Sequence, residues 1–161
     1  EPGKFLVSEA GAFITRVNSM KTTPSTVFAQ VNSGFNHFPR PMMYNAYHHI
    51  ENISNPDGEQ RLYTIVGYVC ETDTFGYDRK LNEVRNGDLL AFHNAGAYCS
   101  SMSSQYNSRV RPAEVLIEGN RSYLIRERET MDDLLRGTIE HGLYLDNVTQ
   151  GKEEAEIAVP S

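Results

Sequence analysis

Residues 61–76 read RLYTIVGYVCETDTFG, and the first ten carry the richest run of β-branched and aromatic side chains in the chain. Such a composition favours a pleated, half-buried strand. We therefore predict a core strand over residues 61–70 that ends on Cys70. A structural strand usually closes on Gly, Asn or Pro, whereas here a thiol is followed at once by an acid, Glu71. The segment therefore bears on function as well as on fold.

Further strands are predicted on both sides of this segment. Alternation of apolar and polar residues indicates strands in AGAFITRVNSMK (10–21) and STVFAQV (25–31). In AEVLIEGNRSYLIRE (113–127), two alternating stretches flank Gly119-Asn120, a pair that takes positive φ at low cost. This arrangement predicts a β-hairpin.

Turn and helix signals complete the pattern. RNGD (85–88) is an Asn-Gly turn, and ETMDDLLRG (129–137) predicts a short helix with Thr130 as its N-cap and Gly137 as its terminator. We therefore predict a mainly β fold: an antiparallel, Greek-key-like β-barrel or sandwich with short helices.

Length and composition limit the classes of partner. The 161 residues suit one domain, with a formal net charge of −6 and no stretch that concentrates Lys and Arg, so we expect neither nucleic acid nor anionic lipid as a partner. No apolar run is long enough for a bilayer, and no membrane association is expected. The two cysteines, Cys70 and Cys99, predict free thiols in a reducing cytoplasm. His48 and His49 lack metal-ligand spacing with them, so no metal site is expected.

The segment PRPMMYNAYHH (39–49) is a candidate anion site. Arg40 lies between two prolines and Tyr44 follows four residues later, so one helical turn would bring both to one side. A guanidinium and a phenol suit a carboxylate or phosphate. The alternative is a loop arginine satisfied by backbone carbonyls, with Tyr44 at the rim of the core.

Two further stretches are candidates. In NAGAYCSSMSSQYN (94–107), Gly96 permits close backbone approach and Tyr98 opens a polar loop that caps or binds something. Cys70 and Glu71 would point to opposite faces of an extended strand, and only a bend lets both reach one cavity. The alternative for this pair is a buried structural cysteine beside a surface acid.

Taken together, these segments resemble one family, the pyridoxal-phosphate decarboxylases with an alanine-racemase-like fold, and within it the diaminopimelate decarboxylases. The resemblance rests on EPGK, RPMMYNAYHHI, CETD, GDLLAFHNAGAYCSSMSSQYNSRVRPAEVLI and LIRERETMDDLL. It implies that residues 1–9 end a missing N-terminal β/α barrel, that 10–145 form a C-terminal β-barrel domain, and that 146–161 are a flexible tail. A start on Glu1 rather than Met agrees with a piece of a longer protein.

The resemblance also implies a cofactor, pyridoxal 5'-phosphate, whose Schiff-base lysine belongs to the missing barrel. By this analogy Glu1 pairs with the pyridine nitrogen, and Tyr98 lies near the cofactor. Gly3 and Lys4 resemble the contacts near the phosphate and the substrate. The family usually has Arg at the position of Lys4, so the charge is kept and the two-pronged geometry is lost.

For the substrate, the resemblance implies that Arg40 and Tyr44 bind a distal carboxylate. Cys70 and Glu71 match a pair of residues that one subunit of a homodimer contributes to the active site of the other. In that site Cys70 donates a proton and Glu71 binds the distal amino group. The family's next acid falls four residues past the cysteine, whereas Asp73 falls three past it, so we assign Asp73 no role in the site.

The resemblance therefore implies a cytoplasmic enzyme that converts meso-2,6-diaminopimelate to L-lysine and CO2, with this chain alone inactive. Two alternatives remain open. One is a decarboxylase of another basic amino acid or of a polyamine precursor. The other is a non-catalytic dimerisation or regulatory module, which would need none of the five residues Arg40, Tyr44, Cys70, Glu71 and Tyr98.

Overall fold

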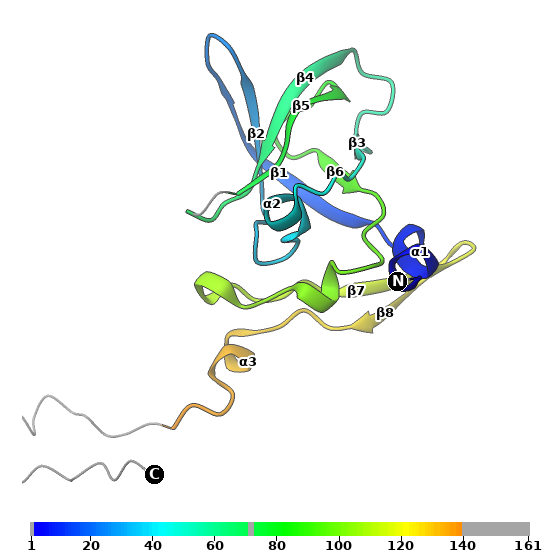
Figure 1. Cartoon of the computed structure of the whole chain (residues 1–161), viewed down its shortest axis with the longest axis vertical. Helices are drawn as coiled ribbons and strands as arrows, with labels where there is room; N and C mark the ends of the chain where they lie inside the picture. Colours follow the sequence, from blue (N-terminus) through cyan, green and yellow to red (C-terminus); the bar gives the residue numbers. More distant parts are fainter. Residues whose placement is uncertain (1, 71–72, 140–161) are drawn as a thin grey trace, which may run out of the picture.

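A computed structural model of the chain describes residues 2–70 and 73–139 (Figure 1). Its main body is a six-stranded sheet with the strand order β3-β6-β1-β2-β4-β5. The strands are β1 (Phe13–Thr22), β2 (Val27–Val31), β3 (Ile50–Asn52), β4 (Gln60–Val66), β5 (Thr74–Asn82) and β6 (Leu89–Phe92). The two edge strands, β3 and β5, pack against each other, so the sheet nearly closes into a barrel.

Most strand pairs are antiparallel, as predicted, and β2 and β4 form a parallel pair. The parallel pair needs a long crossover, which is supplied by the chain between residues 32 and 59. This crossover contains α2 (Arg40–Tyr44) and β3. The predicted mainly β barrel is confirmed, and the crossover places α2 beside β5.

The alternation in β1 sets one wall of the core. Phe13, Thr15 and Val17 are buried, and Ile14 and Arg16 between them are exposed. Because successive side chains of a strand point to opposite faces, this confirms the strand predicted over residues 10–21.

Phenylalanines from four segments meet in the barrel interior. The ring centroids of Phe13 and Phe38 lie 5.6 Å apart, and those of Phe75 and Phe92 lie 5.0 Å apart. All four side chains are buried, and each contributes about 1.5–3 kcal/mol by leaving water. The barrel therefore contains a core of its own.

The strand predicted over residues 61–70 is shorter than expected, because β4 ends at Val66. The backbone N–H of Gly67 donates to the Asp73 carbonyl at 2.7 Å, which turns the chain out of the strand. A Cβ at Gly67 would lie 2.1 Å from Asp73 Oδ2, so this approach requires glycine. The prediction that the strand ends on Cys70 is wrong, and Cys70 lies in the loop that follows.

The carboxylate of Asp73 holds that loop. Its Oδ2 accepts the Val69 N–H at 2.9 Å, and its Oδ1 accepts the Phe35 N–H at 2.6 Å. Burial raises the pKa of Asp73, although these two hydrogen bonds act in the opposite direction. Asp73 therefore has a structural role, in tying the loop after β4 to the loop after β2.

A second, two-stranded sheet lies outside the barrel and consists of β7 (Glu114–Glu118) and β8 (Arg121–Arg126). The predicted hairpin is confirmed, and its turn has Gly119 at φ +58°. Every residue of β8 is exposed, as is every residue of β7 after Glu114. The alternating pattern is thus present here without a core beneath it.

Short helices complete the chain: α1 (Gly3–Val7), η1 (Ser8–Ala10), η2 (Ser100–Met102), η3 (Tyr106–Ser108) and α3 (Met131–Leu135). The predicted helix over residues 129–137 is confirmed as α3, where Asp133 accepts the backbone N–H of Thr130 at 2.8 Å and Gly137 has φ +84°. The predicted tail, 146–161, lies outside the described residues. Within the described part of the chain, no helix has the length and apolar character needed to cross a membrane.

Candidate functional site

Helix α2 brings Arg40 and Tyr44 together. It begins after Pro39 and ends where Asn45 takes φ +50°, so it is one short turn with Arg40 first and Tyr44 last. The Arg40 guanidinium carbon lies 5.6 Å from the centroid of the Tyr44 ring. The prediction that one turn places both on the same side is therefore confirmed.

The Arg40 guanidinium is not satisfied by its own loop. Its Nε is buried, and no described residue accepts a hydrogen bond from it. No carboxylate of residues 2–70 and 73–139 lies within ion-pair distance of Arg40. The alternative in which backbone carbonyls satisfy this arginine is wrong for Nε, and the group is free to bind an anion.

Tyr98 lies on the other side of Arg40. The centroid of its ring is 5.6 Å from the Arg40 guanidinium carbon, the same distance as that of Tyr44. Tyr98 has φ +61°, a left-handed conformation that is uncommon for a bulky residue. Backbone strain of this kind is typical of functional sites, because the surrounding structure must hold it.

The close approach predicted at Gly96 holds this loop against the N-terminal helices. The Gly96 N–H donates to the Ser8 carbonyl at 3.0 Å, and a Cβ at Gly96 would lie 1.9 Å from the Val7 carbonyl oxygen. Only glycine fits there. The contact fixes the segment that carries Lys4 relative to the loop that carries Tyr98.

The predicted contacts on α1 are open to solvent. Lys4 is exposed, and an ideal Cβ at Gly3 would meet nothing within 4 Å. Burial lowers the pKa of His48, and the positive charges of Arg40 and Lys4 lower it further. The structure thus brings together Arg40, Tyr44 and Tyr98, with Lys4 near them. Glu1 lies outside the described residues.

His48 and Arg79 belong to the same region, and sequence reasoning missed both. His48 is only 2% exposed, its Nδ1–H donates to the His93 carbonyl at 2.9 Å, and its ring meets Phe38 edge-on at 4.5 Å. Burial lowers its pKa, and the positive charges of Arg40, Lys4 and Arg79 lower it further. His48 is therefore neutral near pH 7, with Nε2 as a buried acceptor.

Cys70 lies in the loop between β4 and β5. Its thiol is exposed and accepts a long hydrogen bond from Asn107 Nδ2, 3.8 Å from Sγ. In Figure 1 the end of β4 and the start of β5, which flank it, lie on the left, whereas α1 lies on the right. The alternative of a buried structural cysteine is wrong for Cys70. Its neighbour Glu71 lies outside the described residues.

The buried thiol of the chain is Cys99. It is 8% exposed, and its Sγ lies 3.7 Å from the His37 carbonyl oxygen. Burial raises the pKa of Cys99 to about 12, and the charge of Glu114 adds to this effect. A thiol in this state is unreactive near neutral pH, so reactivity is expected at Cys70.

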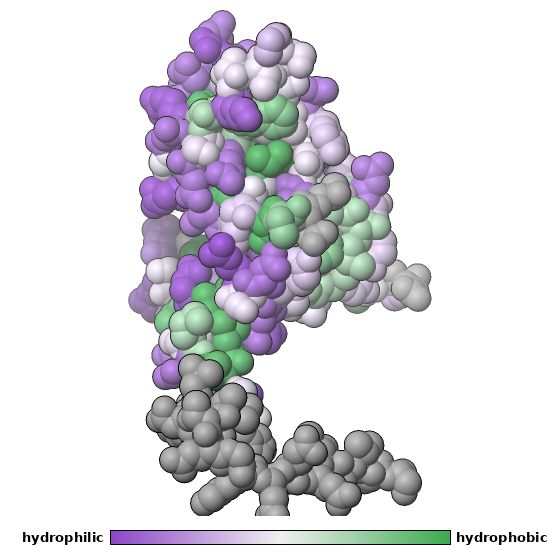
Figure 2. Space-filling model, turned by 90° about the vertical axis from the view of Figure 1, so that its left-hand side faces the viewer, coloured by the Kyte–Doolittle hydropathy of each residue, from purple (hydrophilic) through white to green (hydrophobic). Residues whose placement is uncertain are grey.

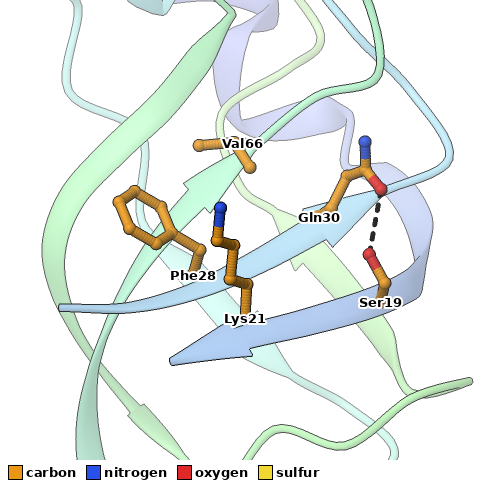
Figure 3. A pocket seen from close by; sticks show the side chains of 5 residues that line it. All are labelled: Ser19, Lys21, Phe28, Gln30 and Val66. Carbon is orange, nitrogen blue, oxygen red and sulfur yellow. Dashed lines mark hydrogen bonds between the residues drawn. The ribbon is translucent and has the colours of Figure 1, made fainter. Parts of the chain in front are cut away.

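Two hollows in the surface lie elsewhere. The first, on the outer face of β1, β2 and β4, is lined by Ser19, Lys21, Phe28, Gln30 and Val66 (Figure 3). Two of its polar side chains pair with each other, because Ser19 donates to Gln30 at 2.9 Å. None of the predicted site residues lines it, and we assign it no chemistry.

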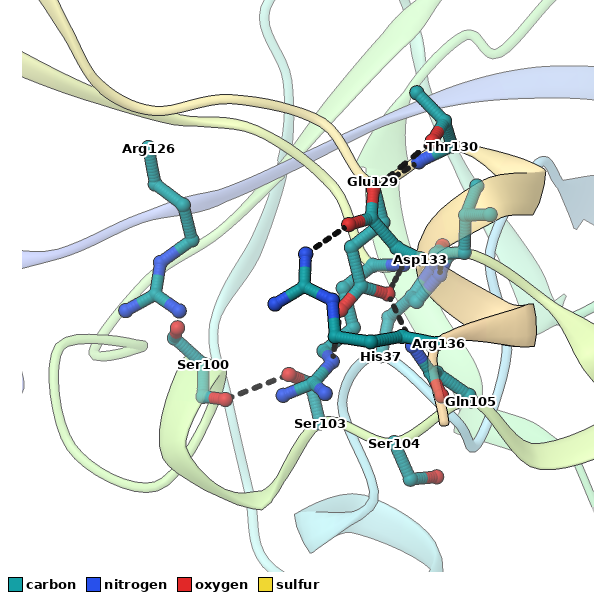
Figure 4. Close-up of polar contacts among 12 residues, drawn as sticks. His37, Ser100, Ser103, Ser104, Gln105, Arg126, Glu129, Thr130, Asp133 and Arg136 are labelled. Carbon is teal, nitrogen blue, oxygen red and sulfur yellow. Dashed lines mark hydrogen bonds and ion pairs between the residues drawn. The ribbon is translucent and has the colours of Figure 1, made fainter. Parts of the chain in front are cut away.

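The second hollow is lined mostly by charged residues, some of which form ion pairs with one another (Figure 4). Glu129 accepts the Arg111 N–H at 2.8 Å and the Gln105 side-chain amide at 3.1 Å, and Asp133 pairs with Arg136 at 2.7 Å. Through its contact with Arg111, Glu129 joins the loop before β7 to the segment that leads into α3. Among the described residues no group of three or more His, Cys, Asp or Glu could hold a metal ion.

The family described as pyridoxal-dependent decarboxylase, C-terminal sheet domain, matches residues 4–96. The match covers more than half of the chain, which therefore belongs to this family.

Particular relatives are diaminopimelate decarboxylases, and the resemblance found in the sequence is confirmed. The chain is 50% identical over 139 residues to that of Methanothermobacter thermautotrophicus, covering 85% of this chain and 32% of the relative. It is 45% identical over 136 residues to that of Methanocaldococcus jannaschii, covering 84% and 31%. The M. jannaschii structure in complex with L-lysine has a TM-score of 0.81 and 41% identity, covering 86% and 32%. The chain spans about a third of the length of these relatives.

The described residues fit one side of a pyridoxal-phosphate site. Lys4 and Arg40 have no ion-pair partner in the described part of the chain. Their positive charges suit an anionic cofactor and an anionic substrate. Tyr98, held in a left-handed conformation beside Arg40, offers a ring and a hydroxyl to the same space. The remaining contacts would come from residues outside the described part.

Proposed function

We propose that the protein containing this chain is a pyridoxal-phosphate-dependent enzyme that converts meso-2,6-diaminopimelate to L-lysine and CO2. The observation that carries this proposal is the Arg40 guanidinium, held between Tyr44 and Tyr98 with a buried Nε that no described group satisfies. In this proposal residues 10–145 belong to the C-terminal β-barrel domain and residues 1–9 end the N-terminal barrel; residues 146–161 lie outside the described residues.

Arg40 and Tyr44 bind the distal carboxylate of the substrate. A guanidinium offers a planar fork of donors that matches a carboxylate, and Tyr44 adds a directed hydroxyl. A charge-assisted hydrogen bond of this kind is worth about 1.5–3 kcal/mol. A substrate whose distal end carries an amine and no carboxylate would leave the positive charges of Arg40 and Lys4 without an anion, so a diamine-forming substrate is disfavoured.

The cofactor, when bound, supplies the electron sink that makes loss of CO2 possible. From this chain, Glu1 would pair with the pyridine nitrogen and keep it protonated. Gly3, Lys4 and Tyr98 would line the phosphate and substrate side. The lysine that holds the cofactor belongs to a part of the protein outside this chain.

Cys70 and Glu71 act in the site of a second subunit. Cys70 donates a proton to the carbon that has lost CO2, a general-acid role worth about 10²–10⁴ in rate. Glu71 accepts from the distal amino group. The exposed thiol of Cys70 supports this division, because a surface thiol is open to a second subunit, and a homodimer would then join the two half-sites that one chain supplies. We place this homodimer in the cytoplasm.

A non-catalytic dimerisation module is the alternative from another class. Burying a guanidinium N–H without a partner costs stability, so a scaffold gains nothing from the Arg40 arrangement. The thiol of Cys70 is likewise exposed, and its long hydrogen bond with Asn107 adds little to a scaffold. Both features favour an enzyme.

The test is release of L-lysine and CO2 from meso-diaminopimelate by the full-length protein with pyridoxal phosphate. Arg40→Gln should lower kcat/KM about 10- to 100-fold, the equivalent of about 1.5–3 kcal/mol of binding energy. The matched control is Arg61→Gln, which removes an exposed arginine already paired with Glu59 at 2.9 Å and should change little. The 161-residue chain alone should show no turnover. Activity in that chain, or an unaffected Arg40→Gln enzyme, would refute the proposal.

A further inference from the structure

Arg79 is placed by a bulge in β5. The β4–β5 register shifts between Tyr63 and Ile65, and Asp78 takes φ +47°. The Arg79 side chain folds back over Gly76, where a Cβ would lie 2.2 Å from its Nε. This geometry sets the guanidinium carbon 4.2 Å from the centroid of the Tyr47 ring.

Arg79 shares two properties with Arg40. The Nε of each is buried without a hydrogen-bond partner among the described residues. None of the ion pairs within residues 2–70 and 73–139 includes Arg40, Arg79 or Lys4. Two buried guanidinium edges without an anion are unusual, because buried polar groups are nearly always satisfied.

His48 connects the two arginines. The helix α2, which begins with Arg40, packs on β5, which carries Arg79. Burial lowers the pKa of the His48 imidazole, and the positive charges of both arginines lower it further. The Nδ1–H of His48 is committed to the His93 carbonyl, so the neutral ring presents only the Nε2 lone pair. That lone pair is buried and has no described partner. It can accept from a guanidinium N–H but cannot accept from a carboxylate.

We propose that Arg79 belongs to the same anion site as Arg40, so that one carboxylate is bound by two guanidinium groups beside the buried imidazole of His48. A carboxylate has about four lone-pair positions and can take donors from two forks at once. Insofar as that carboxylate is the distal one of the substrate, the inference rests on the proposed function. Phosphate shares the oxyanion chemistry, and the test separates the two.

The test uses the cofactor-loaded, full-length protein and two probes, pimelate and inorganic phosphate, titrated calorimetrically. Pimelate is a seven-carbon dicarboxylate without amino groups. Arg79→Gln should weaken pimelate binding about 10-fold and leave phosphate binding unchanged. The control Lys80→Gln removes a charge from the next residue of β5, whose side chain is exposed, and should stay within about twofold of the parent.

Each other outcome overturns the inference. If Arg79→Gln leaves pimelate binding unchanged, or if the parent does not bind pimelate, Arg79 does not belong to a carboxylate site. If Arg79→Gln weakens only phosphate binding, Arg79 belongs to a phosphate site. If circular dichroism shows that Arg79→Gln does not fold, Arg79→Lys is used as the test variant. Lysine keeps the positive charge but lacks the paired N–H donors of the guanidinium. Arg79→Lys should still weaken pimelate binding severalfold, and parent-like binding would contradict the inference.

The outcomes also separate this inference from the proposed function. If the parent does not decarboxylate diaminopimelate but binds pimelate through Arg79, the carboxylate site stands and the substrate assignment fails. If the parent decarboxylates diaminopimelate but Arg79→Gln binds pimelate as tightly as the parent does, the proposed function stands and the inference about Arg79 fails.

Discussion

The six-stranded barrel and the β7–β8 hairpin are built from the same alternating sequence pattern, but they bury it differently. In the barrel the inward residues, such as Phe75 and Phe92, are at most 2% exposed. In the hairpin, Ile117 is 66% exposed, and Leu124 and Ile125 of the opposite strand are 60% exposed. Alternation therefore identifies strands in both regions and says nothing about what covers them.

Apolar side chains of α1 are exposed as well, with Phe5 at 85% and Leu6 at 72%. In Figure 2 hydrophobic side chains gather in the lower part of the molecule, where β7, β8 and α3 lie in Figure 1. The relatives are about three times as long as this chain. The difference teaches that the barrel is stabilised from within, whereas the described residues leave the apolar side chains of the hairpin and of α1 uncovered.

The largest expected effect is a direct contrast between the two regions. Phe92→Ala removes a fully buried ring and should lower the free energy of unfolding by about 3–5 kcal/mol. Ile117→Ser in the hairpin should change it by less than about 0.5 kcal/mol in this chain. Urea unfolding followed by circular dichroism measures both. Equal losses would show that the hairpin is part of the same core.

A smaller loss is expected at the edge of the barrel, where β4 ends. Gly67→Ala forces a methyl group against the Asp73 carboxylate and should cost about 1–3 kcal/mol. The control is Gly87→Ala, because nothing lies within 4 Å of a Cβ there, although its φ of +89° adds backbone strain. If Gly67→Ala unfolds at the same urea concentration as the parent, the Asp73 turn is not what ends the strand.

The smallest effect concerns pH. Burial raises the pKa of Asp73 in the folded state, so the folded protein holds this proton more tightly than the unfolded chain does. Its contribution to stability is therefore greatest below the ordinary pKa of an aspartate and falls as pH rises through the folded-state value. The slope of stability between pH 3 and 6 should differ between the parent and Asp73→Asn in this direction. A slope unaltered by the substitution would assign the pH dependence to other groups.

The sequence predicted those features that depend on neighbours along the chain. The strand β1, the Gly119 turn, the capping of α3 and the Arg40–Tyr44 pair all follow from spacings of a few residues. The end of β4 was misplaced because it depends on Asp73.

The rest of the site depends on contacts between distant segments. Tyr98 meets Arg40 only through the fold, and the packing of α2 against β5, which carries Arg79, likewise joins segments far apart in the sequence. His48 follows the end of α2, where Asn45 turns the chain out of the helix, so no helical spacing relates it to Arg40 or Tyr44. Arg79 has no local signal, since a bulge rather than alternation sets its direction.

The central claim is that Cys70 of one subunit completes the Arg40 site of another. The most direct measurement is the activity of a purified heterodimer in which one full-length subunit carries Arg40→Gln and the other Cys70→Ser. A shared site leaves one of the two sites intact, so the account predicts roughly half of the parent activity, whereas each homodimer of variants is impaired. A heterodimer no more active than the two variant homodimers would show that both residues serve the same subunit, and would contradict the account.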